Sequence, residues 1–262
     1  MLLVIDIGNT NIVFGLYEGE TLRASWRAGT VASRTDDELA LLLRGFLAQA
    51  TVAPEAIEGI AVACVVPALA GPISGMCEKL FGQPPFILSG DEAPGVAVDY
   101  RPPSDVGADR IANAVAAHAL YGGPVIVVDF GTATTFDAVA ADGTYLGGAI
   151  APGVEVAADA LATAASRLYR VGFARPPGVV GKSTVESLQS GMYYGLVGQV
   201  ERIVAAMRQE LGDRARVIAT GGLAALVAPD CPCIEAVHDP LTLDGLRLLW
   251  DRANRKATGH SL

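Results

Sequence analysis

The same short pattern occurs twice in the chain, near the start of each half. Residues 4–11 read Val-Ile-Asp-Ile-Gly-Asn-Thr-Asn, and residues 127–134 read Val-Val-Asp-Phe-Gly-Thr-Ala-Thr. In each copy an apolar run, typical of a buried strand, ends in an aspartate, a glycine and small polar residues. One copy is weak evidence, because such strand ends are common. Two copies, about half of the 262 residues apart, predict duplicated domains that face each other across a nucleotide.

Each copy carries groups that suit a phosphate and its metal ion. Gly8 allows a tight turn without a side chain in the way of a ligand. The amides and hydroxyls that follow it can donate hydrogen bonds to phosphate oxygens. Asp6 is placed to hold a hydrated Mg²⁺, which prefers one or two carboxylates together with phosphate oxygens. A third glycine turn, at residues 220–223, has no acid. It suits either a nucleoside or α-phosphate at a helix start, or simply a tight strand-to-helix turn.

The expected elements have the same order in both halves. In the first half we expect strands at 2–7, 12–17 and 21–27, a helix from 36, a strand at 59–66, a helix from 67 and a strand at 86–88. In the second half we expect strands at 125–129, 133–140 and 144–151, then a helix that follows the Pro-Gly pair at 152–153 and runs to about 165. A long helix at 183–211, a strand at 216–220, a short helix, a strand at 234–237 and a helix at 243–255 complete this half. This β-β-β-α-β-α-β order, found twice, predicts an α/β fold with domains 1–120 and 121–262. The polar residues 256–262 are expected to fray.

Composition excludes several classes of protein. Hydrophobic residues make up 51% of the chain and charged residues 18%, which is enough for a substantial core. The net charge of −9 argues against a nucleic-acid partner, because phosphate backbones are bound by basic patches. The four cysteines fit neither a zinc site nor a disulfide framework. The first residues lack the basic region of a signal peptide, and no run of about 18 apolar residues occurs. We therefore expect a cytoplasmic protein without a membrane partner.

A second cluster of interest follows a loop rich in proline and glycine at residues 90–106. Gly107, Ala108, Asp109 and Arg110 open an apolar helix there. Asp109 can simply be an acid that the helix dipole stabilises. In a catalytic interpretation, Asp109 is a base that takes a proton from an attacking hydroxyl, and Arg110 binds a substrate carboxylate in a forked geometry.

The sequence Gly181-Lys182-Ser183-Thr184 looks like the end of a P-loop, but we reject that interpretation. A P-loop needs a glycine five residues before Gly181, where this chain has Pro176, and no strand is expected before it. Ser183 or Thr184 can cap the helix that follows, or Thr184 can contact a ligand.

Four segments together resemble the type III pantothenate kinase family. They are Asp-Ile-Gly-Asn-Thr-Asn at 6–11, Gly-Ala-Asp-Arg at 107–110, Asp-Phe-Gly-Thr-Ala-Thr at 129–134 and Gly-Ala-Ile-Ala-Pro-Gly at 148–153. Any one of them is shared with acetate kinases, sugar kinases, heat-shock chaperones and actin, but the four in this order are specific. The resemblance runs from the first strand to the last helix. It implies two actin-like (ribonuclease H-like) domains, a homodimer, and transfer of the ATP γ-phosphate to the primary hydroxyl of pantothenate, the first step of coenzyme A biosynthesis.

The resemblance also implies roles for particular residues. Asp109 would be the proton acceptor, Asp6 would lie beside Mg²⁺-ATP, and Asp129 would bind K⁺ or NH₄⁺. ATP would be bound by Asp6, Ile7, Gly8, Asn9, Thr10, Asn11, Ile12, Val13 and Thr132. Pantothenate would be bound by Tyr100, Gly107, Ala108, Asp109, Arg110 and Thr184, with Arg110 near its carboxylate. The chemistry agrees independently, because phosphoryl transfer depends on positioning and charge neutralisation more than on a covalent nucleophile.

Three other functions stay open on the sequence. The first is a related kinase that acts on a sugar or a short acid, although the compact chain argues against a sugar kinase. The second is a non-catalytic accessory factor for transcription, which the negative charge and the three intact aspartates disfavour. The third is an ATP-dependent chaperone-like module, for which the chain offers no substrate-binding domain.

Overall fold

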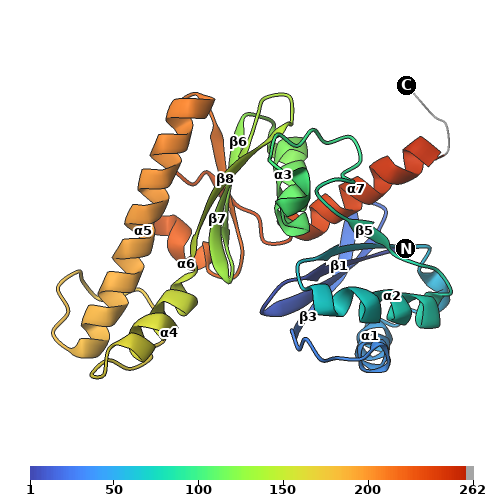
Figure 1. Ribbon diagram of the computed structural model, residues 1–262, viewed down its shortest axis with the longest axis horizontal. Coiled ribbons are helices and arrows are strands. Elements are labelled where there is room, and N and C mark those ends of the chain that lie inside the picture. Colours follow the sequence, from blue (N-terminus) through green and yellow to red (C-terminus); the bar gives the residue numbers. More distant parts are fainter. Residues whose placement is uncertain (258–262) are drawn as a thin grey trace. The chain divides into compact units, whose positions relative to one another are not determined.

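The structure is a computed structural model that describes residues 1–257. Two compact units are present, the first made of residues 1–116 with the C-terminal segment from Leu241, and the second of residues 117–240. Each unit contains a five-stranded mixed sheet covered by helices (Figure 1). The predicted α/β class with two duplicated domains is confirmed. The β-β-β-α-β-α-β order holds in the first half, whereas the second half carries two helices between its third and fourth strands.

The first unit is built on a sheet with the strand order β3-β2-β1-β4-β5. β1 is antiparallel to β2 and parallel to β4, so the first two strands form a hairpin and the fourth returns through a helix. The elements are β1 (Leu2–Ile7), β2 (Asn11–Glu18), β3 (Thr21–Gly29), α1 (Asp36–Gln49), β4 (Gly59–Cys64), α2 (Pro67–Phe81), β5 (Phe86–Leu88), α3 (Ala108–Tyr121) and α7 (Leu241–Ala257), with short 3₁₀ turns at Pro54–Ala56 and Pro103–Asp105.

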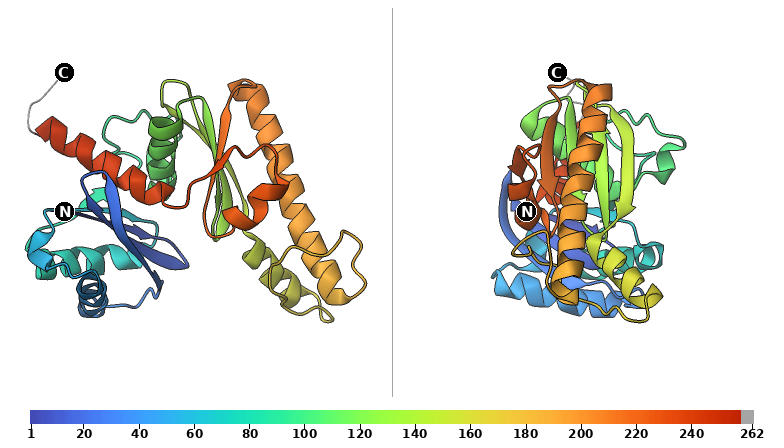
Figure 2. Two further views of the ribbon diagram at one scale, coloured as in Figure 1. Left: turned by 180° about the vertical axis from the view of Figure 1, so that it is seen from behind. Right: turned by 90° about the vertical axis from the view of Figure 1, so that its left-hand side faces the viewer.

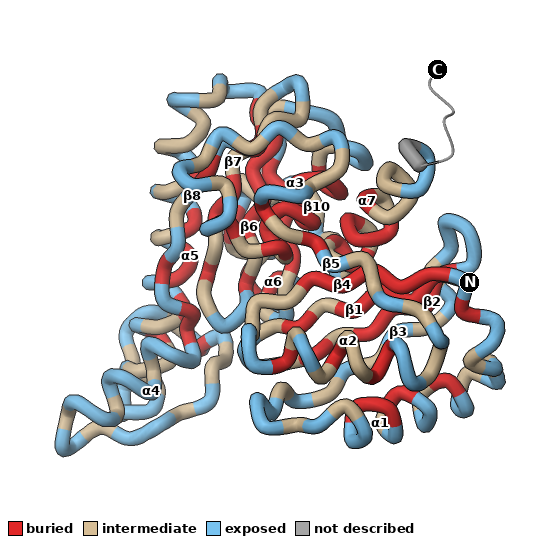
Figure 3. The backbone as a smooth tube through the Cα atoms, turned by 45° about the vertical axis from the view of Figure 1, so that its right-hand side comes forward, coloured by how far each residue is buried: buried red, intermediate tan, exposed pale blue. Residues whose placement is uncertain are grey.

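Side chains along β1 point alternately to the two faces of this sheet, and each face is covered by different helices. Leu3, Ile5 and Ile7 are fully buried and join the core formed with α1 and α2, which lie on the same side of the sheet (Figure 1). The other face carries α7, shown in red in Figure 2. A Cβ on Gly59 of β4 would lie 2.2 Å from the Trp250 ring of α7, so glycine is needed for this close packing. In Figure 3 the buried residues follow the central strands of the sheet.

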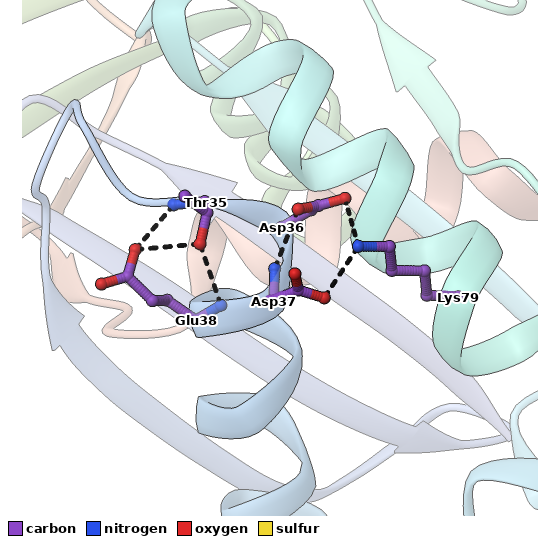
Figure 4. A network of polar contacts seen from close by, with 5 residues as sticks. All are labelled: Thr35, Asp36, Asp37, Glu38 and Lys79. Carbon is purple, nitrogen blue, oxygen red and sulfur yellow. Dashed lines mark hydrogen bonds and ion pairs between the residues drawn. The ribbon is translucent and has the colours of Figure 1, made fainter.

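The start of α1 is fixed by two sets of polar contacts (Figure 4). Thr35 is the N-cap: its hydroxyl accepts a hydrogen bond from the Glu38 amide, and the Glu38 carboxylate accepts one from the Thr35 amide. This reciprocal capping box satisfies two amides that the helix itself cannot pair. Lys79 of α2 lies 2.7 Å from the carboxylates of both Asp36 and Asp37, and so joins the two helices.

The second unit repeats the plan with the strand order β10-β9-β6-β7-β8. Its elements are β6 (Val125–Phe130), β7 (Ala133–Val139), β8 (Tyr145–Pro152), α4 (Val154–Ala164), α5 (Thr184–Leu211), β9 (Arg216–Thr220), α6 (Ala224–Val227), a 3₁₀ turn at Ala228–Asp230 and β10 (Ala236–Val237). β6 is antiparallel to β7 and parallel to β9. The long helix α5 packs on β6 and β7, with Val200 and Val204 fully or almost fully buried in the core between them.

The compact units differ in two respects from the division expected at residue 120, since the first break along the chain falls after residue 116 and α7 belongs to the first unit. The contacts of α7 with β1, β2 and β4 group it with the first unit, although it follows the second along the chain. The boundary at 120/121 stays a prediction, and the expected fraying falls largely on residues 258–262, outside the described part. Cys64, Cys77, Cys231 and Cys233 are all free. Within residues 1–257, no helix is both long and apolar enough to cross a lipid bilayer.

Candidate active site

The first phosphate-loop candidate is a tight turn between β1 and β2. The amide of Gly8 donates a hydrogen bond to the Asn11 carbonyl at 2.9 Å, which closes the turn. A Cβ on Gly8 would lie 3.2 Å from the same carbonyl oxygen, so a larger residue would press on the loop. Asn9 and Thr10 are exposed at the tip of the turn. A ligand can therefore reach the backbone and side chains of the tip.

Two of the predicted ATP-binding residues contribute no side chain to this loop. Ile7 and Ile12 are fully buried in the core of the first unit. Val13 pairs with Asp6 across the hairpin and is partly buried. We therefore expect the two isoleucines to interact with a nucleotide only through their main chain.

The structure brings Asp6 and Asp109 to the same edge of the first unit. Asp6 is the second-last residue of β1 and lies on the face opposite Leu3, Ile5 and Ile7, because side chains alternate along a strand. The amide of Val65, just after β4, donates to the Ile7 carbonyl at 3.0 Å. The Val65 side chain in turn lies 3.6 Å from the position of a Cβ on Gly107, at the start of the helix that carries Asp109.

Asp109 lies in the first turn of α3, in a partly buried position. Its carboxylate accepts a hydrogen bond from the Arg110 amide at 2.8 Å. Burial raises the pKa of Asp109 above its ordinary value, against the opposing effects of the Arg110 amide and the Arg110 charge. A carboxylate with a raised pKa is a stronger base than an exposed one, as general base catalysis near neutral pH requires. A Cβ on Gly107 would lie 2.5 Å from the Asp109 Oδ1 atom, so glycine leaves room for that carboxylate.

The loop at 90–106 folds back on itself ahead of this helix. A Cβ on Gly90 would lie 2.0 Å from the Pro103 carbonyl oxygen, so the two ends of the loop touch at a glycine. Tyr100 lies within the loop and is partly exposed, whereas Ala108 and Arg110 are buried at the helix start. The structure thus joins Gly107, Ala108, Asp109 and Arg110 in one turn, and the Tyr100 loop leads directly into it.

In the second unit, Asp129 lies at the end of β6 among glycines. It pairs with Thr135 of β7 and Thr220 of β9. The Gly131 amide donates to the Ala133 carbonyl at 3.0 Å and closes the second turn. Gly221 follows β9 with φ of +91°, and a Cβ there would lie 2.4 Å from the Asp129 Oδ1 atom. The glycine at position 221 therefore leaves the space that the Asp129 carboxylate occupies.

Gly153 makes a close approach to the second turn that sequence reasoning did not single out. It is the N-cap of α4, and a Cβ there would lie 2.2 Å from the Thr132 carbonyl oxygen. Thr132 itself is exposed. The sequence signal was the Pro-Gly pair at 152–153, but its contact with Thr132 depends on the pairing of β8 with β7.

Thr184 is the exposed first residue of α5 and is not the helix cap. Ser183 is the cap, because its hydroxyl accepts a hydrogen bond from the Glu186 amide at 3.2 Å. Residues 166–183 contain no strand, and a Cβ on Gly181 would lie 2.4 Å from the Ser187 amide nitrogen. Both facts agree with the rejection of a P-loop. No contact in the described structure brings Thr184 to Asp129.

Two units of the same plan, each with an aspartate near the end of its central strand and a glycine turn after it, define the class of proteins with an actin-like fold. Solved structures support this fold. The chain superposes with TM-score 0.57 and 13% identity on an activator of a 2-hydroxyisocaproyl-CoA dehydratase from Clostridium difficile with bound ADPNP, covering 100% of this chain and 98% of that one. It superposes on the inorganic polyphosphate/ATP-glucomannokinase of Arthrobacter sp. strain KM with TM-score 0.53 and 15% identity, covering 97% and 98%.

The sequence comparisons are more specific. A family model described as type III pantothenate kinase matches residues 2–206. The type III pantothenate kinase of Moorella thermoacetica is 47% identical over 252 residues, which covers 96% of this chain and 99% of the relative. That of Syntrophotalea carbinolica is 51% identical with the same coverage. The chain belongs to the type III pantothenate kinase family.

Proposed function

We propose that this protein is an ATP-dependent pantothenate kinase that produces 4'-phosphopantothenate. The observation that carries the proposal is the position of Asp109, a partly buried acid at the same sheet edge as the first glycine turn. Family membership over almost the whole chain supplies the substrate class.

The residues of the first unit support the chemistry of the transfer. Asp109 accepts the proton of the primary hydroxyl as the hydroxyl oxygen forms a bond to the γ-phosphorus. The bond from that phosphorus to the bridging oxygen of ADP breaks, and ADP leaves with the electron pair. Arg110 binds the pantothenate carboxylate, together with Tyr100 and the backbone of Gly107 and Ala108. Thr184, which belongs to the second unit, is a further residue proposed to bind pantothenate. Charge-assisted contacts of this kind are stronger than neutral hydrogen bonds.

The proposed cation sites use the two strand-end carboxylates. A divalent metal ion accompanies ATP in kinases and neutralises charge on the phosphate oxygens. Asp6, partly buried beside the first turn, fits an Mg²⁺ that keeps several waters. Asp129, whose carboxylate lies against Gly221, is proposed to bind K⁺ or NH₄⁺. Asn9, Thr10, Asn11 and Thr132 are exposed or partly exposed, as residues that bind ATP need to be.

The test is ATP consumption with and without pantothenate, in K⁺ buffer and in Na⁺ buffer. We expect ADP to form only when pantothenate is present and to form faster in K⁺. The Asp129→Ala variant should lose the K⁺ stimulation. Acetate and sugars serve as parallel acceptors, and a preference for one of them would replace pantothenate by another substrate. K⁺ dependence that persists in the variant would move the cation away from Asp129.

We also propose a homodimer built on the second unit. Apolar side chains are exposed on α4, the loop at 166–182 and α5, namely Val156, Leu161, Tyr169, Val179, Val180, Val185 and Tyr194. The loop is held on α5 by hydrogen bonds from Ser190 to the Val179 carbonyl and from Gln189 to the Gly172 carbonyl. A cavity of about 450 Å³ lies between α4 and α5. Several exposed apolar side chains on helices and on a loop that is bonded to α5 favour a protein partner at this surface.

Light scattering should give twice the chain mass of 27.0 kDa. The Leu161→Asp variant should shift the mass toward the monomer, because a carboxylate is costly to bury at an apolar interface. A monomeric wild-type protein would remove the dimer from the proposal. The proposed setting is the cytoplasm, with ATP and pantothenate as the small-molecule partners and with neither nucleic acid nor membrane.

A further inference from the structure

The residue that follows β3 is bonded to the first glycine turn at two points. The Thr30 amide donates a hydrogen bond to the Thr10 carbonyl at 2.9 Å. The Thr30 hydroxyl donates a second one to the Gly8 carbonyl at 2.7 Å. The amide contact continues the ladder in which Gly29 pairs with Asn11. The hydroxyl contact is additional, since it depends on the side chain at position 30.

We propose that Thr30 is a positioning residue for the phosphate-binding turn, an inference that rests on the proposed binding of ATP there. In a trans peptide the carbonyl and the next amide point in opposite directions within one plane. Holding the Gly8 carbonyl toward Thr30 therefore turns the Asn9 amide away from Thr30. Holding the Thr10 carbonyl does the same for the Asn11 amide. Amides that are already held in one orientation can bind phosphate oxygens without the free-energy cost of being ordered on binding.

The segment that carries Thr30 is itself anchored at its far end. The Arg34 amide donates to the Val31 carbonyl at 3.0 Å and makes a turn between Thr30 and α1. Thr35 then caps α1, and Lys79 ties the start of α1 to α2 (Figure 4). Thr30 thus lies between β3 and a capped helix. Its backbone is held on both sides, and this fixes the position from which its hydroxyl bonds to the Gly8 carbonyl.

In the second unit, the residue that follows the third strand also contacts the glycine turn. Pro152, the last residue of β8, pairs with Ala133 just as Gly29, the last residue of β3, pairs with Asn11. The next residue is Gly153, which touches the Thr132 carbonyl with its backbone where Thr30 uses a hydroxyl. In both units the residue after the third strand contacts the glycine turn. This recurrence indicates that the contact belongs to the duplicated plan and is not confined to one loop.

The experiment compares Thr30→Val, which removes the hydroxyl at nearly constant shape, with Thr30→Ser, which keeps it. Thr21→Val is the matched control, at an exposed threonine that begins β3, the strand that Thr30 follows. Hydrogen exchange of the peptide that spans residues 6–13 is measured without ligand, and the Kd for Mg²⁺-ADP is measured by calorimetry. We expect faster exchange and a roughly 3- to 10-fold weaker Kd in Thr30→Val, since one hydrogen bond is lost. Thr30→Ser should stay within about twofold, and Thr21→Val should match wild type.

Unchanged exchange and unchanged Kd in Thr30→Val would overturn the inference. An equal loss in Thr30→Ser would also overturn it, because the hydroxyl would then not be the cause, and this variant decides the question if Thr30→Val does not fold. Failure of the wild-type protein to bind Mg²⁺-ADP would refute the proposed function instead. The exchange measurement would still report whether Thr30 holds the turn.

Discussion

Replacing Asp109 by asparagine is expected to lower kcat by about 10²- to 10⁴-fold, the usual contribution of a general base. Asparagine keeps the size of the side chain and an oxygen that can accept the Arg110 amide hydrogen bond. It cannot accept the hydroxyl proton. The affinity for ATP should not change, because the proposed ATP-binding turn at residues 8–11 belongs to another segment. The measurement is kcat and KM for both substrates, with ATP binding followed by calorimetry.

The pH profile provides a second readout for Asp109. Burial raises the pKa of its carboxyl, so the deprotonated base forms only at higher pH than for an exposed aspartate. The pKa that governs the acidic limb of the kcat/KM profile should therefore lie above the ordinary aspartate range. The value of kcat/KM should fall as the pH drops through this pKa. Asp105→Asn, at an exposed acid a few residues earlier, is the matched control and should keep both rate and profile. A normal rate in Asp109→Asn would exclude this residue as the base.

Features that depend on local sequence could be predicted well. The runs that end at Asp6 and Asp129 are apolar over a strand length, and both strands were found. The expected helix from residue 36 was found, and of the two cap candidates Ser183 and Thr184 the structure selects Ser183. The glycine that follows each aspartate gave the turns. Each of these signals lies within a few residues of the structure it specifies.

Features that depend on strand pairing could not be predicted in the same way. Thr30 gives no local signal, because its bonds to the Gly8 and Thr10 carbonyls follow from the register of β3 on β2. Gly153 reads as an ordinary helix start until β8 is paired with β7. The grouping of α7 with the first unit follows from packing such as that of Trp250 on Gly59. Register and packing between distant segments are set by the whole fold.

Replacing Gly221 by alanine is expected to have the second large effect. Its φ of +91° lies where residues with a Cβ are strained. The new Cβ would lie 2.4 Å from the Asp129 Oδ1 atom and 2.7 Å from backbone atoms of Phe130. Backbone cannot yield as a flexible side chain does, so the end of β6 must shift. We expect a loss of roughly 1–3 kcal/mol in unfolding free energy. A drop of up to about 10²-fold in kcat/KM should accompany it, as a displaced binding group can cause.

Substitution of the neighbouring Gly222 is the control that separates strain at position 221 from a general intolerance of this turn to alanine. Gly222 has an ordinary φ, and a Cβ there would meet nothing within 4 Å. The Tm of Gly222→Ala should therefore match wild type while that of Gly221→Ala falls. If activity is lost through the Asp129 carboxylate, Gly221→Ala should cost little further activity in an Asp129→Ala background, because the two changes act on one group. Full additivity of the two losses would show that Gly221 acts on the rate by a route other than Asp129.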